Sequence, residues 1–445
     1  MKKIIAFTIA LFLCFFLIQG KLFAGNKAIE KALEKRIQEI VKEITPRLIE
    51  IRRDIHAHPE LGFQEKRTSA IVSEYFQELG LEVRTGIGGT GVLGILRGGK
   101  PGLVVGMRGD MDALPITEET GLPYASKEKA MVRGREVGLM HACGHDIHTT
   151  MLLGVAHSLC QLQKELPGTV LFVAQPAEEW GDGADKMLKD GLFKDIKPEA
   201  MFAFHVDDSS KVGFIKYTPG FSGANCDGFN LTIKSEGCHG SSPHSCVDPI
   251  VVGSQIVVGL QVMVSREIDV HKNTVITVGS FHAGSASNVI PQNAELRATI
   301  RSYGEDQRKL LKEKVERLIG NICEAGGAQY ELDYFFGTPS LYNNPDLMKE
   351  ILPVVARVLE GKEFLIEELP MMGGEDFSYF AREIPSVMLD LGVCPKDLAK
   401  TSVHSPAFIA DEEGIPLGVK VMSHVILDYL TRHRAQYSKP KPSPR

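Results

Sequence analysis

The sequence predicts an α/β protein in which a larger domain, built on a central mixed sheet flanked by helices, is interrupted by a smaller inserted α+β domain. Three observations lead to this fold class. Short apolar strands alternate with helical patterns before residue 222, and a different order of elements fills residues 223–337. The alternation of helices and strands then resumes from residue 338. We therefore assign residues 26–222 and 338–437 to one discontinuous domain and residues 223–337 to the insertion.

The larger domain begins with an amphipathic helix. Apolar residues step by three or four from Ile29 to Ile55, which predicts a helix that bends at Pro46 and ends at His58-Pro59. Helical roles explain His56 and His58 better than metal ligation does. At the other end of the chain, the proline- and lysine-rich residues 438–445 predict a disordered tail.

Three apolar strands of the larger domain each end in polar residues suited to chemistry. The predicted strands and the groups that follow them are 103–107 with Asp110 and Asp112, 169–174 with Glu178 and Glu179, and 201–204 with His205. In open α/β sheets, sites form at the carboxyl ends of the strands. Three successive strands with such endings therefore predict a functional site at this edge.

Residues 138–159 add a thiol and further imidazoles. Cys143 and His145 lie two residues apart, and His148 follows, directly before an apolar helical pattern. Asp146 is suited to cap that helix, which would place the ligand-type residues in the preceding turn. A thiolate and an imidazole beside a helix start favour a metal such as zinc, whereas the alternative is a buried structural cysteine followed by helix-capping residues.

The insertion has the order strand–helix–strand–strand–helix–strand, which is the ferredoxin-like pattern. Asp248 followed by Pro249 predicts the start of its first helix. Glycines at 220–223 and 337 mark its limits. The predicted strands lie near 229–233, 274–281, 294–300 and 329–334, and the predicted helices span 248–266 and 305–323.

Composition limits the partners and the compartment. The 445 residues are 43% hydrophobic and 24% charged, with a net charge of -6 and no basic stripe, which argues against nucleic acid as a partner. Residues 1–24 have the charged start, apolar run and cleavage-type end of a signal peptide, so we expect an exported protein, periplasmic or secreted, with an uncleaved anchor as the alternative. In an oxidising compartment, Cys238 and Cys246 could form a disulfide.

Several separated motifs together identify a family resemblance. RRDIHAHPELGFQE, RGDMDALP, MHACGHDIH, QPAEE, HGSSPH, ASNVIP, GGEDF and the late His404 occur in one order. This set resembles the amidohydrolase branch of the aminoacylase and carboxypeptidase G metallopeptidase family, which includes hippurate hydrolases and auxin-conjugate hydrolases. The resemblance extends over residues 47–430 and implies that the insertion is a lid and dimerisation domain.

The resemblance also implies roles for individual residues. Two divalent ions, zinc or manganese with cobalt as a third choice, would be held by Cys143, His145, Glu179, His205 and His404, with Cys143 as the bridge. Glu178 would be the general base and acid, and Asp112 would fix a ligand imidazole. In the insertion, His239 would stabilise the oxyanion, often in the partner subunit's site, and Asn288 and Arg301 would hold the amino-acid part of the substrate.

The predicted reaction is hydrolysis of the amide bond of N-acyl amino acids, such as hippurate or N-acetyl conjugates, in a homodimer. The sequence leaves a metallo-dipeptidase or carboxypeptidase of the same family open, and, in another class, a catalytically silent protein that binds a metal or ligand. A thiol hydrolase built on Cys143 and His145 is disfavoured, because such close neighbours rarely align for attack.

Overall fold

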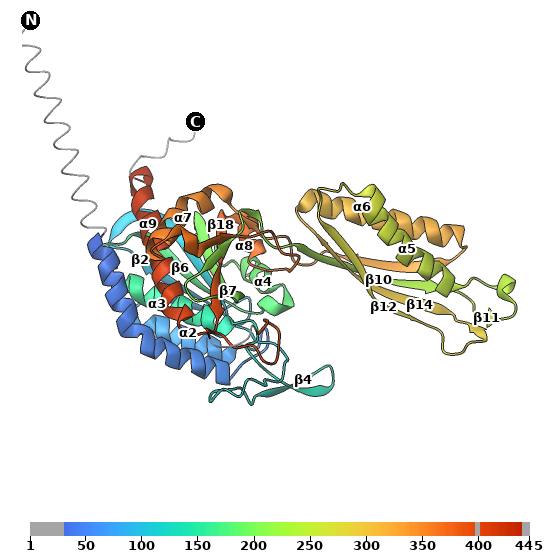
Figure 1. Cartoon of the computed structure of the whole chain (residues 1–445), viewed down its shortest axis with the longest axis horizontal. Helices are drawn as coiled ribbons and strands as arrows, with labels where there is room; N and C mark the ends of the chain where they lie inside the picture. Colours follow the sequence, from blue (N-terminus) through green and yellow to red (C-terminus); the bar gives the residue numbers. More distant parts are fainter. Residues whose placement is uncertain (1–30, 397–400, 438–445) are drawn as a thin grey trace, which may run out of the picture.

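The computed structural model describes residues 31–396 and 401–437. The predicted signal peptide and the predicted tail lie outside these residues. Figure 1 shows a larger layered body and a smaller one that projects from it on the green and yellow middle of the chain. The predicted α/β class with an inserted α+β domain is confirmed.

The larger body is built on an eight-stranded mixed sheet of order β1-β2-β6-β3-β7-β18-β8-β17. Its central strands β6, β3, β7 and β18 run parallel, so their carboxyl ends share one edge. The strands are β1 (Glu82–Ile87), β2 (Gly91–Arg97), β3 (Lys100–Asp110), β6 (Pro167–Gln175), β7 (Ala200–Lys211), β8 (Ile215–Tyr217), β17 (Leu365–Glu367) and β18 (Ser386–Cys394).

Helices cover both faces of this sheet, because alternate strand residues face opposite sides. Val170 and Phe172 of β6 join one core, whereas Leu171 and Val173 join the other. The first core is covered by a helix over residues 31–57 and by α2 (Lys66–Glu78), α3 (His145–Cys160), α7 (Pro345–Val358) and α9 (Gly414–Tyr437). The second core is covered by α4 (Gly183–Lys189) and α8 (Ser378–Glu383).

The first helix continues through Pro46 without interruption and ends at residue 57, before Pro59. Its buried stripe includes Ile37, Val41 and Leu48, so packing against the core holds the helix together on both sides of the proline. This helix matters for the site because Arg52 and His56 project from its last turns into the interior.

The smaller body, called the lid from here on (residues 223–337), contains a four-stranded antiparallel sheet of order β12-β14-β10-β15 with two helices packed on one face. In chain order this is the predicted ferredoxin-like pattern. Asp248 caps α5 by accepting from the backbone N–H groups of Ile250 and Val251, as predicted. The elements are β10 (Asn225–Lys234), α5 (Pro249–Glu267), β12 (Thr274–Ala283), β14 (Asn293–Ser302), α6 (Glu305–Ala325) and β15 (Gln329–Phe335).

Two chain segments join the lid to the larger body. Gly337 lies at the second of them, where an added Cβ would come within 2.1 Å of the carbonyl oxygen of Cys226. Only glycine allows this close approach of the two connecting segments. The buried Arg308–Asp227 ion pair fixes the same region, since Arg308 also donates to the Gly337 carbonyl and Gly337 N–H donates to Asp227.

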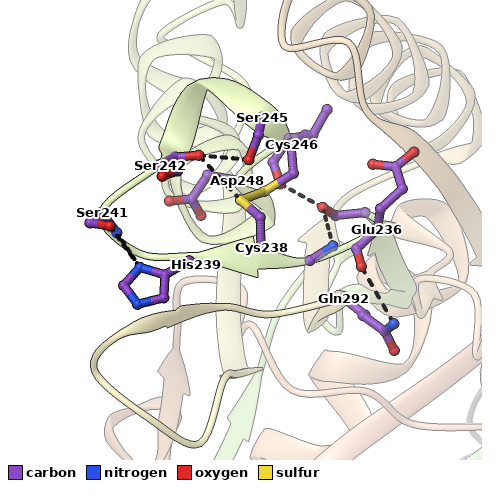
Figure 2. Close-up of a disulfide and its surroundings, with 12 residues drawn as sticks. Glu236, Cys238, His239, Ser241, Ser242, Ser245, Cys246, Asp248 and Gln292 are labelled. Atoms are coloured by element: carbon purple, nitrogen blue, oxygen red, sulfur yellow. Dashed lines mark hydrogen bonds between the residues drawn. A yellow bond between two sulfur atoms is a disulfide. The ribbon is translucent and has the colours of Figure 1, made fainter.

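The far end of the lid carries a short ribbon of β11 (Cys238–His239) and β13 (Val289–Ile290). A disulfide joins Cys238 to Cys246, across eight positions of sequence. Figure 2 shows that it closes the loop that carries His239. The short pairs elsewhere are β4 (Lys129–Val132) with β5 (Arg135–Gly138) and β9 (Gly220–Phe221) with β16 (Tyr342–Asn343).

Candidate metal centre

The polar groups predicted at the strand ends do meet at one edge of the sheet. Asp110 ends β3, Glu178 and Glu179 follow β6, and His205 lies on β7. Cys143 and His145 arrive beside them at the start of α3. Cys143, Glu178, Glu179 and His205 border a cleft of about 1080 Å³ that reaches from the larger body to the lid.

The start of α3 differs from the prediction. Gly144, with φ of 77°, occupies the cap position, and Asp146 lies inside the first turn. The Asp146 carboxylate is fully buried and pairs with Arg52 Nε at 2.8 Å and His56 Nδ1 at 2.8 Å. The prediction of Asp146 as the cap was therefore wrong. Its carboxylate is committed to a buried ion pair with the first helix, and Gly144 makes the turn instead.

Cys143 is the meeting point of two imidazoles. Its Sγ lies 3.5 Å from His205 Nε2 and 3.2 Å from His404 Nε2. His205 Nδ1 donates to the Val206 carbonyl at 2.8 Å, so its Nε2 presents a lone pair toward the sulfur. His404 adopts a positive φ of 62° and its N–H donates to the Ala142 carbonyl, which brings the ring over Cys143.

Asp112 orients His145 and the two glutamates. Its Oδ1 and its carbonyl lie 3.1 and 2.9 Å from His145 Nδ1, and its carboxylate also accepts from the N–H groups of Glu178 and Glu179. His145 Nε2 then lies 3.6 Å from Asp110 Oδ2 and 3.9 Å from Glu179 Oε1. One carboxylate fixes an imidazole and both glutamates.

Buried atoms without hydrogen-bond partners indicate that this set of side chains is suited to hold a metal ion. His145 Nε2 and Glu179 Oε1 are buried, and no described residue forms a hydrogen bond with either. Buried polar atoms without partners are rare in proteins and usually mark an ion or a functional group. Thiol, imidazole and carboxylate atoms lie within 4.8 Å of one another in three overlapping groups, Cys143–His145–His205, Cys143–Glu179–His404 and His145–Glu178–Glu179.

Glu178 has a different environment from Glu179. Burial first, and then the charges of Glu375, Asp376 and Glu179, raise the pKa of Glu178 well above its ordinary value. The neighbouring acids are themselves tied to Arg108, which donates to Glu375 Oε1 at 2.8 Å and contacts Asp376 Oδ1 at 3.2 Å. A carboxyl group whose pKa is raised above its ordinary value, toward the working pH, is suited to general acid–base catalysis.

Three buried supports of the site were missed by sequence reasoning. Glu65 accepts from Ala177 N–H at 2.8 Å and from Thr90 Oγ1, holding the turn before Glu178, where Ala177 has a φ of 52°. His148 links Asp110 Oδ1, at 2.7 Å, to the N–H of Val206 beside His205. Burial lowers the pKa of His148 to about 4, so it serves as a neutral link. The third is Arg108, described above.

The three predicted lid residues do not lie in one place. Arg301, on β14, lines the cleft together with Phe335 and Phe336. His239 and Asn288 lie together at the far tip, where Gly240 N–H donates to the Asn288 carbonyl, and neither lines the cleft. Figure 1 places β11 at the end of the lid away from the larger body. His239 Nδ1 accepts from Ser241 N–H, which leaves the Nε2 of a neutral ring to carry the proton (Figure 2).

Similarity to known proteins extends over most of the chain. Thermostable carboxypeptidase 1 of Saccharolobus solfataricus is 35% identical over 387 residues, which cover 85% of this chain and 94% of that protein. An N-acetylcysteine deacetylase of Bacillus subtilis is 37% identical over 370 residues, 83% of this chain and 93% of the relative. The solved structure of Bacillus subtilis YxeP, described as a dinuclear metal-binding peptidase of the M20 family, has a TM-score of 0.74 and 32% identity, covering 88% of this chain and 99% of YxeP.

The sequence profile of peptidase family M20/M25/M40 matches residues 106–428. This range contains every residue of the candidate metal centre, and the family resemblance inferred from the motifs is confirmed. The chain therefore belongs to peptidase family M20/M25/M40 and is a metal-dependent hydrolase.

Proposed function

We propose that this protein hydrolyses the amide bond of N-acyl amino acids, releasing a carboxylic acid and an amino acid. The observation that carries the proposal is the convergence of a thiol, imidazoles and a carboxylate around Cys143, with Glu178 beside them and Arg301 across the cleft. Arg301 offers a guanidinium for the substrate carboxylate. The deacetylase relative acts on N-acetylcysteine by name, whereas the carboxypeptidase relative keeps peptides as the second substrate class.

Two divalent ions fit the donor set, zinc or manganese, with cobalt as a substitute. Cys143 belongs to the group with His145 and His205 and also to the group with Glu179 and His404, so it would be the shared ligand. When bound, such ions polarise a carbonyl and lower the pKa of water. The YxeP structure, described as dinuclear, supports the count of two.

Glu178 supplies the proton transfers. It would accept the proton of the attacking water and deliver it to the leaving nitrogen, which requires a carboxyl whose pKa lies close to the working pH. Burial and the neighbouring acids raise its pKa in the required direction. Asp112 fixes both Glu178 and Glu179 through their backbone N–H groups, so that one glutamate can act as base while the next binds metal.

Metal removal tests the reaction class. We expect a chelator to abolish hydrolysis of an N-acyl amino acid such as hippurate, because the donor set would lose its ions, and Mn²⁺, Zn²⁺ or Co²⁺ to restore it. Metal content measured on the same samples should follow activity up to two ions per chain. Full activity in verified metal-free protein would contradict the proposal.

We further propose that the protein acts as a dimer formed through the lid. The outer face of α5 is exposed and apolar at Ile250, Val251, Val258 and Val262, and the helix carries no charge from residue 249 to 265. By length and composition α5 could also span a membrane, but its inner face packs on the lid sheet. The helix lies over β12, whose outer edge pairs with no other described strand. An apolar helix face beside an open sheet edge supports a two-fold interface.

The dimer would explain the distant lid tip. His239 does not line the cleft of its own chain, so a partner's cleft is the natural place for its Nε2–H, where it would stabilise the developing oxyanion. Glu178→Ala and His239→Ala should each be nearly inactive alone. Refolding an equal mixture should restore about a quarter of wild-type activity, by counting one intact site in half of the dimers.

The mixing experiment also has a negative outcome. If His239 acted on its own chain after lid closure, every site in the mixed dimers would lack one of the two groups. No recovery would then appear, and the trans assignment would be dropped. Size measurements must first show that both variants are dimers, because monomers would also show no recovery of activity.

We also propose that the protein works outside the cytoplasm. The signal-like pattern of residues 1–24 and the Cys238–Cys246 disulfide both support an oxidising compartment. Mass spectrometry of protein from the native host should find a mature chain that begins near Gly25. A reduced, full-length chain in the cytosolic fraction would contradict this proposal.

A further inference from the structure

A second cavity lies where the lid meets the larger body, and it shares no lining residue with the cleft beside the metal centre. Its volume is about 280 Å³, near the lower limit of small-molecule sites, which is roughly 300 Å³. We call it the hinge pocket. The larger body contributes Pro219, Phe221 and Pro370 to its walls, and the lid contributes His271, Lys272, Asn273, Tyr303 and Gln307.

Two aromatic rings, one from each body, meet in the hinge pocket. The rings of Phe221 and Tyr303 stack with their centroids 5.8 Å apart and an interplanar angle of 25°. Tyr303 Oη also donates to the carbonyl of Met371 in the larger body at 2.9 Å. The rings therefore form a fixed aromatic surface, on which a planar ring of a ligand can stack.

The lid wall carries a cation without a partner. Lys272 lies in the turn before β12, and its side chain forms no ion pair or hydrogen bond with a described residue. Asp269 fixes this turn, because its carboxylate accepts from His271 N–H at 3.0 Å and its carbonyl accepts from Lys272 N–H at 2.8 Å. None of the described residues that line the pocket is acidic. Lys272 therefore favours an anion there.

Asn273, next to Lys272, adds a neutral donor to the same wall. Its side-chain amide is exposed and has no hydrogen-bond partner among the described residues. An ammonium group and an amide N–H suit the two oxygens of a carboxylate. A bare inorganic anion would leave the aromatic surface uncovered, and a neutral ring would leave Lys272 unpaired.

We propose that the hinge pocket binds a small aromatic carboxylate, and that the bound molecule holds the lid against the larger body. A ligand that contacts both walls binds best while the walls keep their spacing, so it stabilises this arrangement of the two bodies. Movement of the lid would change that spacing. An occupied pocket should therefore slow turnover without competing for the cleft, which makes it a regulatory site beyond the proposed reaction.

Calorimetry with three probes tests the binding. Benzoate has both a ring and a charge, whereas acetate lacks the ring and benzyl alcohol lacks the charge. We expect benzoate to bind about tenfold more tightly than either, because only benzoate meets both walls. Lys272→Gln should weaken benzoate binding by about twofold to fivefold, as for a partly solvated ion pair. Phe221→Leu should also weaken it, because the variant loses the stacking ring.

Two further variants are controls for place. Lys309→Gln removes an exposed lysine of the lid that does not line the hinge pocket and lies 4.0 Å from Glu305, so benzoate binding should stay at the wild-type value. Arg301→Gln removes the cation of the cleft and should also leave this binding unchanged. Melting temperatures of all variants separate a lost site from misfolding.

Kinetics with an N-acetyl amino acid test the coupling to turnover, because this substrate releases acetate and no aromatic acid. Benzoate should lower kcat and leave KM nearly unchanged. Lys272→Gln should keep the activity measured without benzoate and need about twofold to fivefold more benzoate for the same inhibition.

The outcomes are distinguishable. Equal benzoate affinity in wild type, Lys272→Gln and Phe221→Leu would overturn the site. Binding that raises KM alone, or that leaves the kinetics unchanged, would overturn its regulatory role. Both results leave the proposed amide hydrolysis intact. If metal-loaded protein hydrolysed no N-acyl amino acid, the proposed function would fail, and calorimetry would still decide whether the hinge pocket binds benzoate.

Discussion

The two bodies of this protein place their functional groups in opposite ways. In the larger body, His145, His148 and Asp112 are buried, and each is oriented by a further polar group. In the lid, His239 is exposed on a ribbon at the tip and is held only by its loop. In the larger body, the side chains of the site are therefore also buried side chains that stabilise the fold. In the lid, an exposed side chain such as that of His239 can be replaced without destabilising the fold. This difference can be tested by mutation.

The largest expected effect is on turnover in the larger body. Glu178→Gln keeps the size of the side chain but removes the proton acceptor, so kcat should fall by roughly 10²–10⁴-fold. Metal content should remain near wild type, because Glu178 is not among the predicted ligands. Steady-state kinetics and metal analysis of the same sample check this.

Glu179→Gln is the matched control at the adjacent position. This variant should lose metal first and activity as a consequence, because Glu179 Oε1 faces both His145 and His404. If Glu178→Gln lost the metal and Glu179→Gln kept it, the two roles would have to be exchanged.

The next effect is on stability. Asp146→Asn leaves Arg52 and His56 buried without their shared carboxylate, and removing one partner of a buried ion pair costs about 3–5 kcal/mol. Chemical denaturation of the metal-free protein measures this loss without a contribution from metal binding.

A lid ion pair supplies the comparison. Lys234 and Glu331 pair on the exposed face of the lid, and such pairs contribute roughly 0.2–1 kcal/mol. Glu331→Gln should therefore be close to wild type in the same denaturation experiment. Equal losses in Asp146→Asn and Glu331→Gln would remove the contrast drawn between the two bodies.

The last expected effect concerns acid. Burial lowers the pKa of His424, on α9, to about 4, and its Nδ1 donates to the Lys420 carbonyl. The unfolded chain binds this proton near pH 6.5, whereas the folded protein resists it. The contribution of His424 to stability is therefore full above pH 6.5 and is lost as pH falls toward 4, by on the order of 3 kcal/mol.

Unfolding measured from pH 7.5 to 4.5 checks this slope. His424→Gln should flatten it relative to wild type, because the variant has no imidazole to titrate. His282→Gln, at an exposed position of the lid strand β12, should leave the wild-type slope unchanged. A steeper slope in His424→Gln would contradict the assignment.

The same contrast explains what the sequence could predict. The lid was predicted element by element, because Ala294, Leu296, Ala298 and Ile300 alternate and Asp248-Pro249 marks a helix start, and both signals are local. In the larger body, the residues at the strand ends were found by the same kind of local pattern.

What escaped prediction depends on contacts between distant residues. Arg108 is 267 positions from Glu375, and Glu65 is 112 positions from the Ala177 backbone it supports. Asp146 was given a capping role because the sequence does not show that Arg52 and His56 would take its carboxylate. Position along the chain cannot reveal such a partner until the fold brings it close.

The position of β18 has a consequence for biosynthesis. β18 lies between β7 and β8 in the central sheet, yet it is made after the whole lid. Until then β7 is an open edge, β8 can pair only with β17, and His404 does not yet exist to meet Cys143. The lid has a core of its own and could fold as soon as it is made. The growing chain would then carry a folded lid on an incomplete central sheet. The unpaired edge of that sheet can pair with the wrong strand, so protection by a chaperone would be useful until β18 has been made.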